Sequence, residues 1–161
     1  MHFDGVRSRH GIGAGIVLIL SAGEESIHSF RLEFDCTNNV VEYEALLLGL
    51  EIGRDMKIKC LSVIGDSDLV VSQVRNQFAA KNDRLCNYRN ALWDAIEIFD
   101  AFSIKAVLRE ENTLADTLSV TTCTFAIPEC LKEKNCKVEA LFRPFFPENK
   151  ITGNFMIIML K

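Results

Sequence analysis

The first third of the chain carries the pattern of short strands separated by glycine-containing turns. An apolar stub over residues 1–3 ends at Asp4, and a basic, glycine-containing connection follows over residues 7–13. Residues 14–20 are apolar and rich in strand formers, and residues 26–34 alternate apolar and polar positions. These segments predict an antiparallel meander of three strands.

The hydrophobic period changes from that of a strand to that of a helix near residue 37. Thr37 or Asn38 can cap a helix over residues 38–54. On this helix Glu42 shares a face with small and apolar residues, so we expect it to point inward, and we expect Glu44 at the rim or surface. The plain explanation for an acid at this position is a favourable interaction with the helix dipole.

Strands and helices alternate through the rest of the globular part. A short apolar run over 60–65 predicts a buried parallel strand, and a second strand is expected over 102–108. Helices are expected over residues 67–77, 85–99 and 113–119. The order β-β-β-α-β-α-α-β-α predicts an α/β fold with a mixed five-stranded sheet, three strands antiparallel and two parallel, and helices on both faces.

Length and composition favour one domain with an appendage. The chain has 161 residues, of which 48% are hydrophobic, which is ample for a core. We expect a domain over residues 1–120 and an irregular or partly ordered C-terminal appendage over residues 121–161, where all three prolines lie. Neither a signal peptide nor a transmembrane run is recognisable, so we expect an intracellular chain, cytoplasmic or nuclear, with no membrane partner.

Charge and cysteine content exclude some functional classes. The net charge of −4 argues against a strongly basic nucleic-acid-binding surface. The six cysteines include no CxxC pair, so neither a zinc site nor a disulfide framework is indicated.

Four acids lie at junctions between the expected elements: Asp4, Glu42, Asp66 and Asp116. Taken alone, an acid after a strand is usually a helix cap or a turn residue. If the first and fourth strands are neighbours, however, their ends bring Asp4 and Asp66 together. Such carboxylates repel one another, so divalent cations are their natural partners, and oxygen ligands favour Mg²⁺ or Mn²⁺ over zinc.

The motifs around these acids resemble the type 1 ribonuclease H family. The resemblance is narrower to the ribonuclease H domain of plant Ty3/gypsy-type retrotransposon polyproteins, and it covers residues 1 to 120. It is carried in order by Phe3-Asp4-Gly5, Thr37-Asn38-Asn39 with Glu42, Gly65-Asp66-Ser67, and Arg109-Glu110-Glu111-Asn112 with Ala115-Asp116. It implies a ribonuclease H-like fold.

The resemblance also implies an activity and the residues that perform it. The expected function is endonucleolytic hydrolysis of the RNA strand of RNA–DNA hybrids with two Mg²⁺ ions, for which Mn²⁺ is a substitute. The family's catalytic and metal-binding acids fall on Asp4, Glu42, Asp66 and Asp116. Its nucleic-acid contacts fall on Asn38, Asn39, Ser67 and Asn112, although helix capping is an equal alternative for the first two. The expected assembly is a monomer, ancestrally part of a polyprotein with reverse transcriptase and integrase.

The chain departs from the family pattern at three points. Ala106 stands where the family commonly has a histidine, Val6 stands where it usually has a serine, and the first strand begins late. The short first strand, Ala106 and the acidic charge balance support an alternative function. The alternative is a catalytically inactive nucleic-acid-binding remnant of a retroelement polyprotein.

Overall fold

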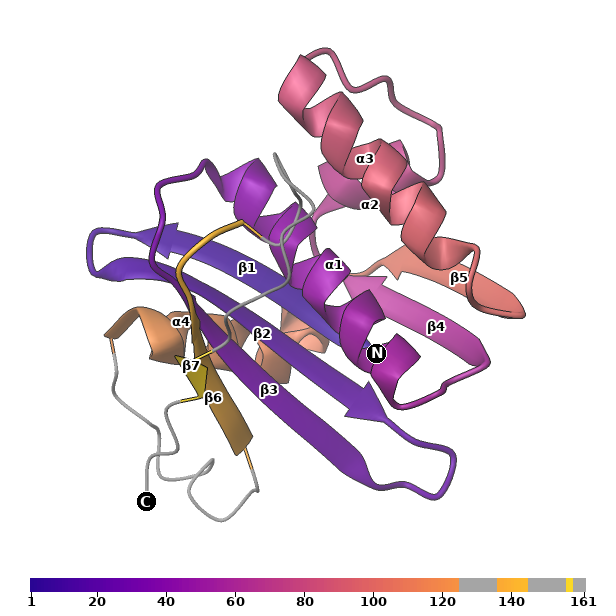
Figure 1. Cartoon of the computed structure of the whole chain (residues 1–161), viewed down its shortest axis with the longest axis horizontal. Helices are drawn as coiled ribbons and strands as arrows, with labels where there is room; N and C mark the ends of the chain where they lie inside the picture. The colour runs from indigo at the N-terminus through magenta and orange to yellow at the C-terminus, as the bar shows by residue number, and fades with distance from the viewer. Residues whose placement is uncertain (125–135, 145–155, 158–161) are drawn as a thin grey trace.

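The computed structural model describes residues 1–124 and 136–144, and the backbone of residues 156–157. Within these ranges one mixed sheet has the strand order β5-β4-β1-β2-β3-β6-β7 (Figure 1). The strands are β1 (His2–Ser8), β2 (Gly11–Ile19), β3 (Glu25–Leu32), β4 (Cys60–Gly65), β5 (Ala101–Ala106), β6 (Cys136–Leu141) and β7 (Met156–Ile157). The helices are α1 (Asn38–Asp55), α2 (Asp68–Val74), α3 (Asp83–Ile96), α4 (Thr113–Thr124) and the short 3₁₀ helix η1 (Arg109–Glu111).

Helices cover both faces of the sheet. Helix α1 packs on β1 and β2 from one side, with α2 and α3 beyond it, and α4 packs on β1, β2 and β3 from the other side (Figure 1). The expected mixed sheet between helices is confirmed, but it has seven strands in the described residues rather than five. No helix of these described ranges combines the length and apolar character needed to cross a membrane.

The C-terminal segment contributes to the sheet. Strand β6 pairs in parallel with β3, and α4 continues to Thr124, past the expected boundary at residue 120. Most other residues of the expected appendage lie outside the described part of the chain, so its division from the domain stays a prediction.

Strand β1 is longer than the sequence indicates, and this corrects the expected position of Asp4. All seven residues of β1 pair antiparallel with β2, so Asp4 lies inside the strand rather than at its end. The polar residues Arg7 and Ser8 suggested a loop, but they continue the ladder into a tight hairpin. The expected three-strand meander is confirmed, because β2 also pairs antiparallel with β3.

On its other side β1 lies parallel to β4, as the argument for a shared acidic site required. The strand register pairs His2 with Ile64, so Asp4 and Asp66 each lie two residues beyond a paired position. The Met1 amine donates a hydrogen bond of 2.6 Å to the Ser62 carbonyl oxygen. The two acids therefore come to the same end of neighbouring strands.

Helix α1 begins at a cap and lies very close to β1. The Thr37 hydroxyl accepts a hydrogen bond from the Val40 amide, which identifies Thr37 as the cap. A Cβ atom at Gly5 would lie 2.6 Å from the Val41 carbonyl oxygen, so only glycine allows this approach. The close approach brings Glu42, on the first turns of α1, to the level of β1.

The expected surface position of Glu44 is wrong. Glu44 is 0% exposed, and the Tyr88 hydroxyl donates a hydrogen bond of 2.5 Å to its Oε1. A surface position for Glu44 would require α1 to be buried on one side only. Helix α3 packs across α1 opposite the sheet, so α1 is buried on two sides.

Candidate metal centre

Three of the four predicted acids meet at one point. Carboxylate oxygens of Asp4, Glu42 and Asp66 all lie within 4.8 Å of one another. They come from β1, from α1 and from the residue after β4, three elements joined by the register and the helix packing described above. We call these three residues the acid cluster.

Asp4 is the least exposed residue of the acid cluster, with 4% of its surface exposed. The pKa of Asp4 is raised to about 6, mainly by burial and also by the negative charges of Asp66 and Asp116, whereas a hydrogen bond from Ser119 opposes this. The carboxylate is therefore held in an environment that disfavours its charge.

Glu42 shows the same conflict more strongly. Burial raises the pKa of Glu42 well above its ordinary value, and the charges of Asp4 and Asp66 add to this effect, whereas a hydrogen bond from the Gly5 amide opposes it. Its Oε2 atom is buried and has no hydrogen-bond partner among the described residues. A buried acceptor without a donor is costly, and a cation satisfies both the acceptor and the repulsion.

The donor set suits a hard divalent cation. All three side chains offer carboxylate oxygens, which are the ligands that Mg²⁺ and Mn²⁺ prefer. The residues therefore fit the metal that the sequence predicts, and the unpartnered Glu42 oxygen is the observation that indicates a ligand.

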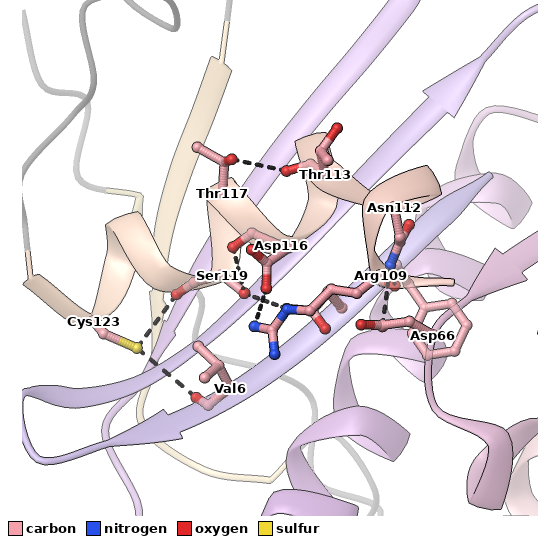
Figure 2. Close-up of polar contacts among 11 residues, drawn as sticks. Val6, Asp66, Arg109, Asn112, Thr113, Asp116, Thr117, Ser119 and Cys123 are labelled. Atoms are coloured by element: carbon pink, nitrogen blue, oxygen red, sulfur yellow. Dashed lines mark hydrogen bonds and ion pairs between the residues drawn. The ribbon is translucent and has the colours of Figure 1, made fainter. Parts of the chain in front are cut away.

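Asp116, the fourth predicted acid, is near the acid cluster but outside it. It lies in the first turn of α4, and its carboxylate forms an ion pair with Arg109 of η1 (Figure 2). Its negative charge still contributes to the raised pKa of Asp4, so it borders the site. The sequence did not indicate this pair, because Arg109 and Asp116 lie on either side of a helix start and no helical period connects them.

Asn112 is buried and forms hydrogen bonds within the protein. It is 1% exposed, and its Nδ2 donates hydrogen bonds to the Phe3 carbonyl oxygen at 2.8 Å and to Asp66 Oδ1 at 3.2 Å (Figure 2). Its Oδ1 lies 3.2 Å from Nδ1 of His2. The buried amide group is thus placed to orient the Asp66 carboxylate, and the expected nucleic-acid contact of Asn112 stays a prediction.

Ser119 is a site residue that sequence reasoning missed. It is 0% exposed, and its hydroxyl donates a hydrogen bond to Oδ2 of Asp4. It also lies 2.8 Å from the carbonyl oxygen of Asp116, one helical turn earlier on α4. The signal available in the sequence was this three-residue spacing from a predicted acid, which places both on one helix face.

The remaining predicted contacts lie at or near the surface. Asn38 is exposed and Asn39 is half-buried, and neither is needed as the cap of α1, because Thr37 supplies it. They line a cavity of about 590 Å³ together with Arg7, Ser8, Arg9 and Thr37. Ser67, next to Asp66, caps α2 by accepting a hydrogen bond of 3.5 Å from the Val70 amide.

Comparison with known proteins gives consistent matches. Residues 2–122 match the family described as reverse transcriptase-like. Ribonuclease HI from Halobacterium salinarum is 29% identical over 120 residues, which cover 73% of this chain and 60% of that protein. The chain thus spans about 60% of the length of this relative.

Solved structures show the same likeness. The crystal structure of RNase H1 from Halobacterium salinarum matches with a TM-score of 0.71 and 28% identity, covering 75% of this chain and 93% of that one. The N-terminal RNase H domain of a Mycobacterium tuberculosis protein matches with a TM-score of 0.66 and 27% identity, covering 77% of this chain and 91% of that one. LC11-RNase H1 was isolated from compost and solved in complex with an RNA/DNA hybrid. It matches with a TM-score of 0.67 and 26% identity, covering 79% of this chain and 97% of that one.

Proposed function

Because the chain belongs to the reverse transcriptase-like family and has the ribonuclease H fold, we propose that it is a divalent-metal-dependent endonuclease that hydrolyses the RNA strand of RNA–DNA hybrids. The single observation that carries this proposal is the acid cluster, in which three carboxylates converge within 4.8 Å and one buried oxygen has no partner in the described residues. Uncompensated acids of this kind are costly to the fold, so their convergence points to a ligand.

Asp4, Glu42 and Asp66 would hold the metal, with Asp116 contributing from the neighbouring helix. Bound Mg²⁺ supplies a water nucleophile at neutral pH and stabilises the charge that develops on the leaving 3′ oxygen. The protein's part is to keep its ligands in place. Ser119 fixes the Asp4 carboxylate and Asn112 fixes that of Asp66, so neither has to reorganise during the reaction.

The hybrid would be bound beside the acid cluster. Asn38, Asn39 and Ser67 present polar groups at this surface, and a contact to a 2′-hydroxyl group distinguishes RNA from DNA. Arg7 and Arg9 in the same cavity supply positive charge to a chain whose net charge is −4. This arrangement supports binding of a sugar-phosphate backbone without a broadly basic surface.

Several finer features belong to the same proposal. The site takes two Mg²⁺ ions, with Mn²⁺ as a substitute, and the products carry 5′-phosphate and 3′-hydroxyl ends. The chain derives from a plant Ty3/gypsy-type retroelement polyprotein with reverse transcriptase and integrase, and it acts as an intracellular monomer. The motif order from Asp4 to Asp116 supports this origin.

One alternative function is favoured by a specific observation. Ala106 lies at the end of β5, paired with Gly65 of β4, at the position where the family commonly has a histidine. A missing proton-transfer group suits a catalytically inactive protein that still binds hybrids.

A cleavage assay separates these functions. The chain is incubated with an RNA–DNA hybrid labelled on the RNA strand, in Mg²⁺ and in EDTA, with RNA and DNA duplexes of the same sequence as controls. We expect Mg²⁺-dependent cleavage of the hybrid's RNA strand alone, with 3′-hydroxyl ends. Hybrid binding without cleavage supports the alternative, and the absence of both binding and cleavage contradicts both functions.

A further inference from the structure

Arg109 provides the positive charge at the edge of the acid cluster. We propose that it is a built-in counter-ion of Asp116, which competes with a divalent cation for this carboxylate and so sets the cation concentration that fills the site. The inference rests on the proposed function, because it concerns the same metal centre.

The ion pair is held by the backbone between its members. The Asn112 amide donates a hydrogen bond of 3.0 Å to the Arg109 carbonyl oxygen, and the Asp116 amide donates one of 3.1 Å to the Asn112 carbonyl oxygen. These two bonds connect η1 to the first turn of α4. The Arg109 side chain therefore reaches Asp116 across a fixed turn rather than from a freely moving loop (Figure 2).

The acids of the site differ in their access to this charge. Among the ion pairs of the described residues, Arg109 with Asp116 is the one that includes a predicted metal ligand. Asp4, Glu42 and Asp66 converge without such a pair. A cation among these three acids has no guanidinium group to displace, although the charge of Arg109 also acts on Glu42. A cation that binds Asp116 must displace the guanidinium group or lie beside it, at a larger electrostatic cost.

The ion pair between Arg109 and Asp116 is exposed enough for its two side chains to separate. The Arg109 side chain is 63% exposed and that of Asp116 is 25% exposed. Exposed ion pairs are weak, so the competition should alter the cation affinity moderately rather than abolish binding. Replacing Arg109 with an uncharged residue should tighten the binding step that involves Asp116 by about two- to five-fold.

Calorimetric titration with Mn²⁺ alone, without nucleic acid, tests this inference. The variants are Arg109→Gln, Asp116→Asn and the double variant. Arg54→Gln is the matched control, because the Arg54 side chain is 52% exposed and pairs with Glu51 and Asp55 near the far end of α1. Melting temperatures in EDTA verify that each variant is folded.

The expected result is tighter Mn²⁺ binding by Arg109→Gln and unchanged binding by Arg54→Gln. In the Asp116→Asn background, Arg109→Gln should have no further effect. Unchanged or weaker Mn²⁺ binding by Arg109→Gln overturns the inference, as does a tightening that persists without the Asp116 carboxylate or that Arg54→Gln reproduces.

The two proposals fail in different ways. A parent chain that cleaves hybrids while Arg109→Gln leaves Mn²⁺ affinity unchanged overturns the inference alone. A parent that binds Mn²⁺ more weakly than Arg109→Gln but cleaves no hybrid supports the inference and overturns the proposed activity. A parent that binds no Mn²⁺ overturns the inference together with the metal site.

Discussion

Glu42 and Glu44 lie two positions apart on α1, yet their surroundings are opposite. Glu42 faces two other carboxylates, and its buried Oε2 has no partner in the described residues. Glu44 is fully buried and accepts a hydrogen bond of 2.5 Å from Tyr88. A glutamate carboxylate therefore has an oxygen without a hydrogen-bond donor on one side of α1, whereas on the other side the carboxylate accepts a hydrogen bond from a buried hydroxyl.

The region around Glu44 is a buried polar network that holds helices together. The Tyr43 hydroxyl donates a hydrogen bond of 2.7 Å to Gln73 of α2, and the rings of Tyr43 and Tyr88 lie 5.7 Å apart between centroids. This network connects α1 to α2 and α3. A satisfied buried carboxylate stabilises the fold, whereas the acid cluster destabilises it until a cation binds, so substitutions in the two regions should have opposite effects on stability.

The largest stability effect should come from the network. Glu44→Ala removes the acceptor of the Tyr88 hydroxyl and leaves a cavity at a position of 0% exposure. We expect it to lower the free energy of unfolding by about 2–4 kcal/mol, and Glu44→Gln to lower it by less because an acceptor and the volume remain. Urea unfolding measures both. A loss below about 0.5 kcal/mol for Glu44→Ala would mean that the network does not hold α3 on α1.

In the absence of metal, replacing Glu42 should have a smaller effect on stability, and of opposite sign. Because burial raises the pKa of this acid, the folded state binds more protons than the unfolded state, and stability falls as pH rises from 4.5 upward. Asp4, whose pKa is also raised, adds a further loss of stability as the pH rises from 3.8 to about 6. In EDTA at pH 7.5, Glu42→Gln should therefore exceed the parent in stability by on the order of 1–3 kcal/mol.

The pH dependence of that difference provides the control. At pH 5 the parent is partly protonated at the site, so the advantage of Glu42→Gln should shrink, and saturating Mg²⁺ should remove it at pH 7.5. Chemical unfolding of both proteins at the two pH values gives the comparison. Equal stabilities at pH 7.5 in EDTA would contradict a repulsive acid cluster.

The smallest effect concerns the surface beside the cluster. Arg7 is 47% exposed in its pair with Asp35, and Arg54 is 52% exposed in its own pairs. In an Asp66→Asn background, which prevents cleavage, Arg7→Ala should reduce the slope of log affinity for a hybrid against log salt concentration by about 0.7–0.9, the value for one phosphate contact. Arg54→Ala should leave the slope unchanged, and equal slopes for both variants would exclude Arg7 from the interface.

The sequence predicted the parts of this structure that depend on local pattern. Alternation predicted the meander, and an apolar run predicted β4 with the bounds it has. The expectation that the first and fourth strands are neighbours predicted that Asp4 and Asp66 meet, although Asp4 lies inside β1 rather than at its end. Each of these inferences used residues close in the chain or the general rule that neighbouring strands bring their ends together.

The features that the sequence did not predict depend on contacts between distant elements. The burial of Glu44 requires α3 to cover α1, and the burial of Asn112 requires η1 to lie against β1. The hydrogen bond from Ser119 to Asp4 joins residues 115 positions apart. A single helical or strand period carries no information about such partners.

The most direct test of the metal site compares hybrid cleavage in Mg²⁺ by Glu42→Gln and Glu44→Gln under conditions where both variants are folded. The two substitutions are chemically identical and lie within one turn of α1. We predict that Glu42→Gln lowers the cleavage rate by about 10³-fold, the scale of losing metal-ion stabilisation, while Glu44→Gln stays within about two-fold of the parent. Cleavage by Glu42→Gln at the parental rate, or an equal loss in both variants, would contradict the assignment of the acid cluster as the catalytic metal centre.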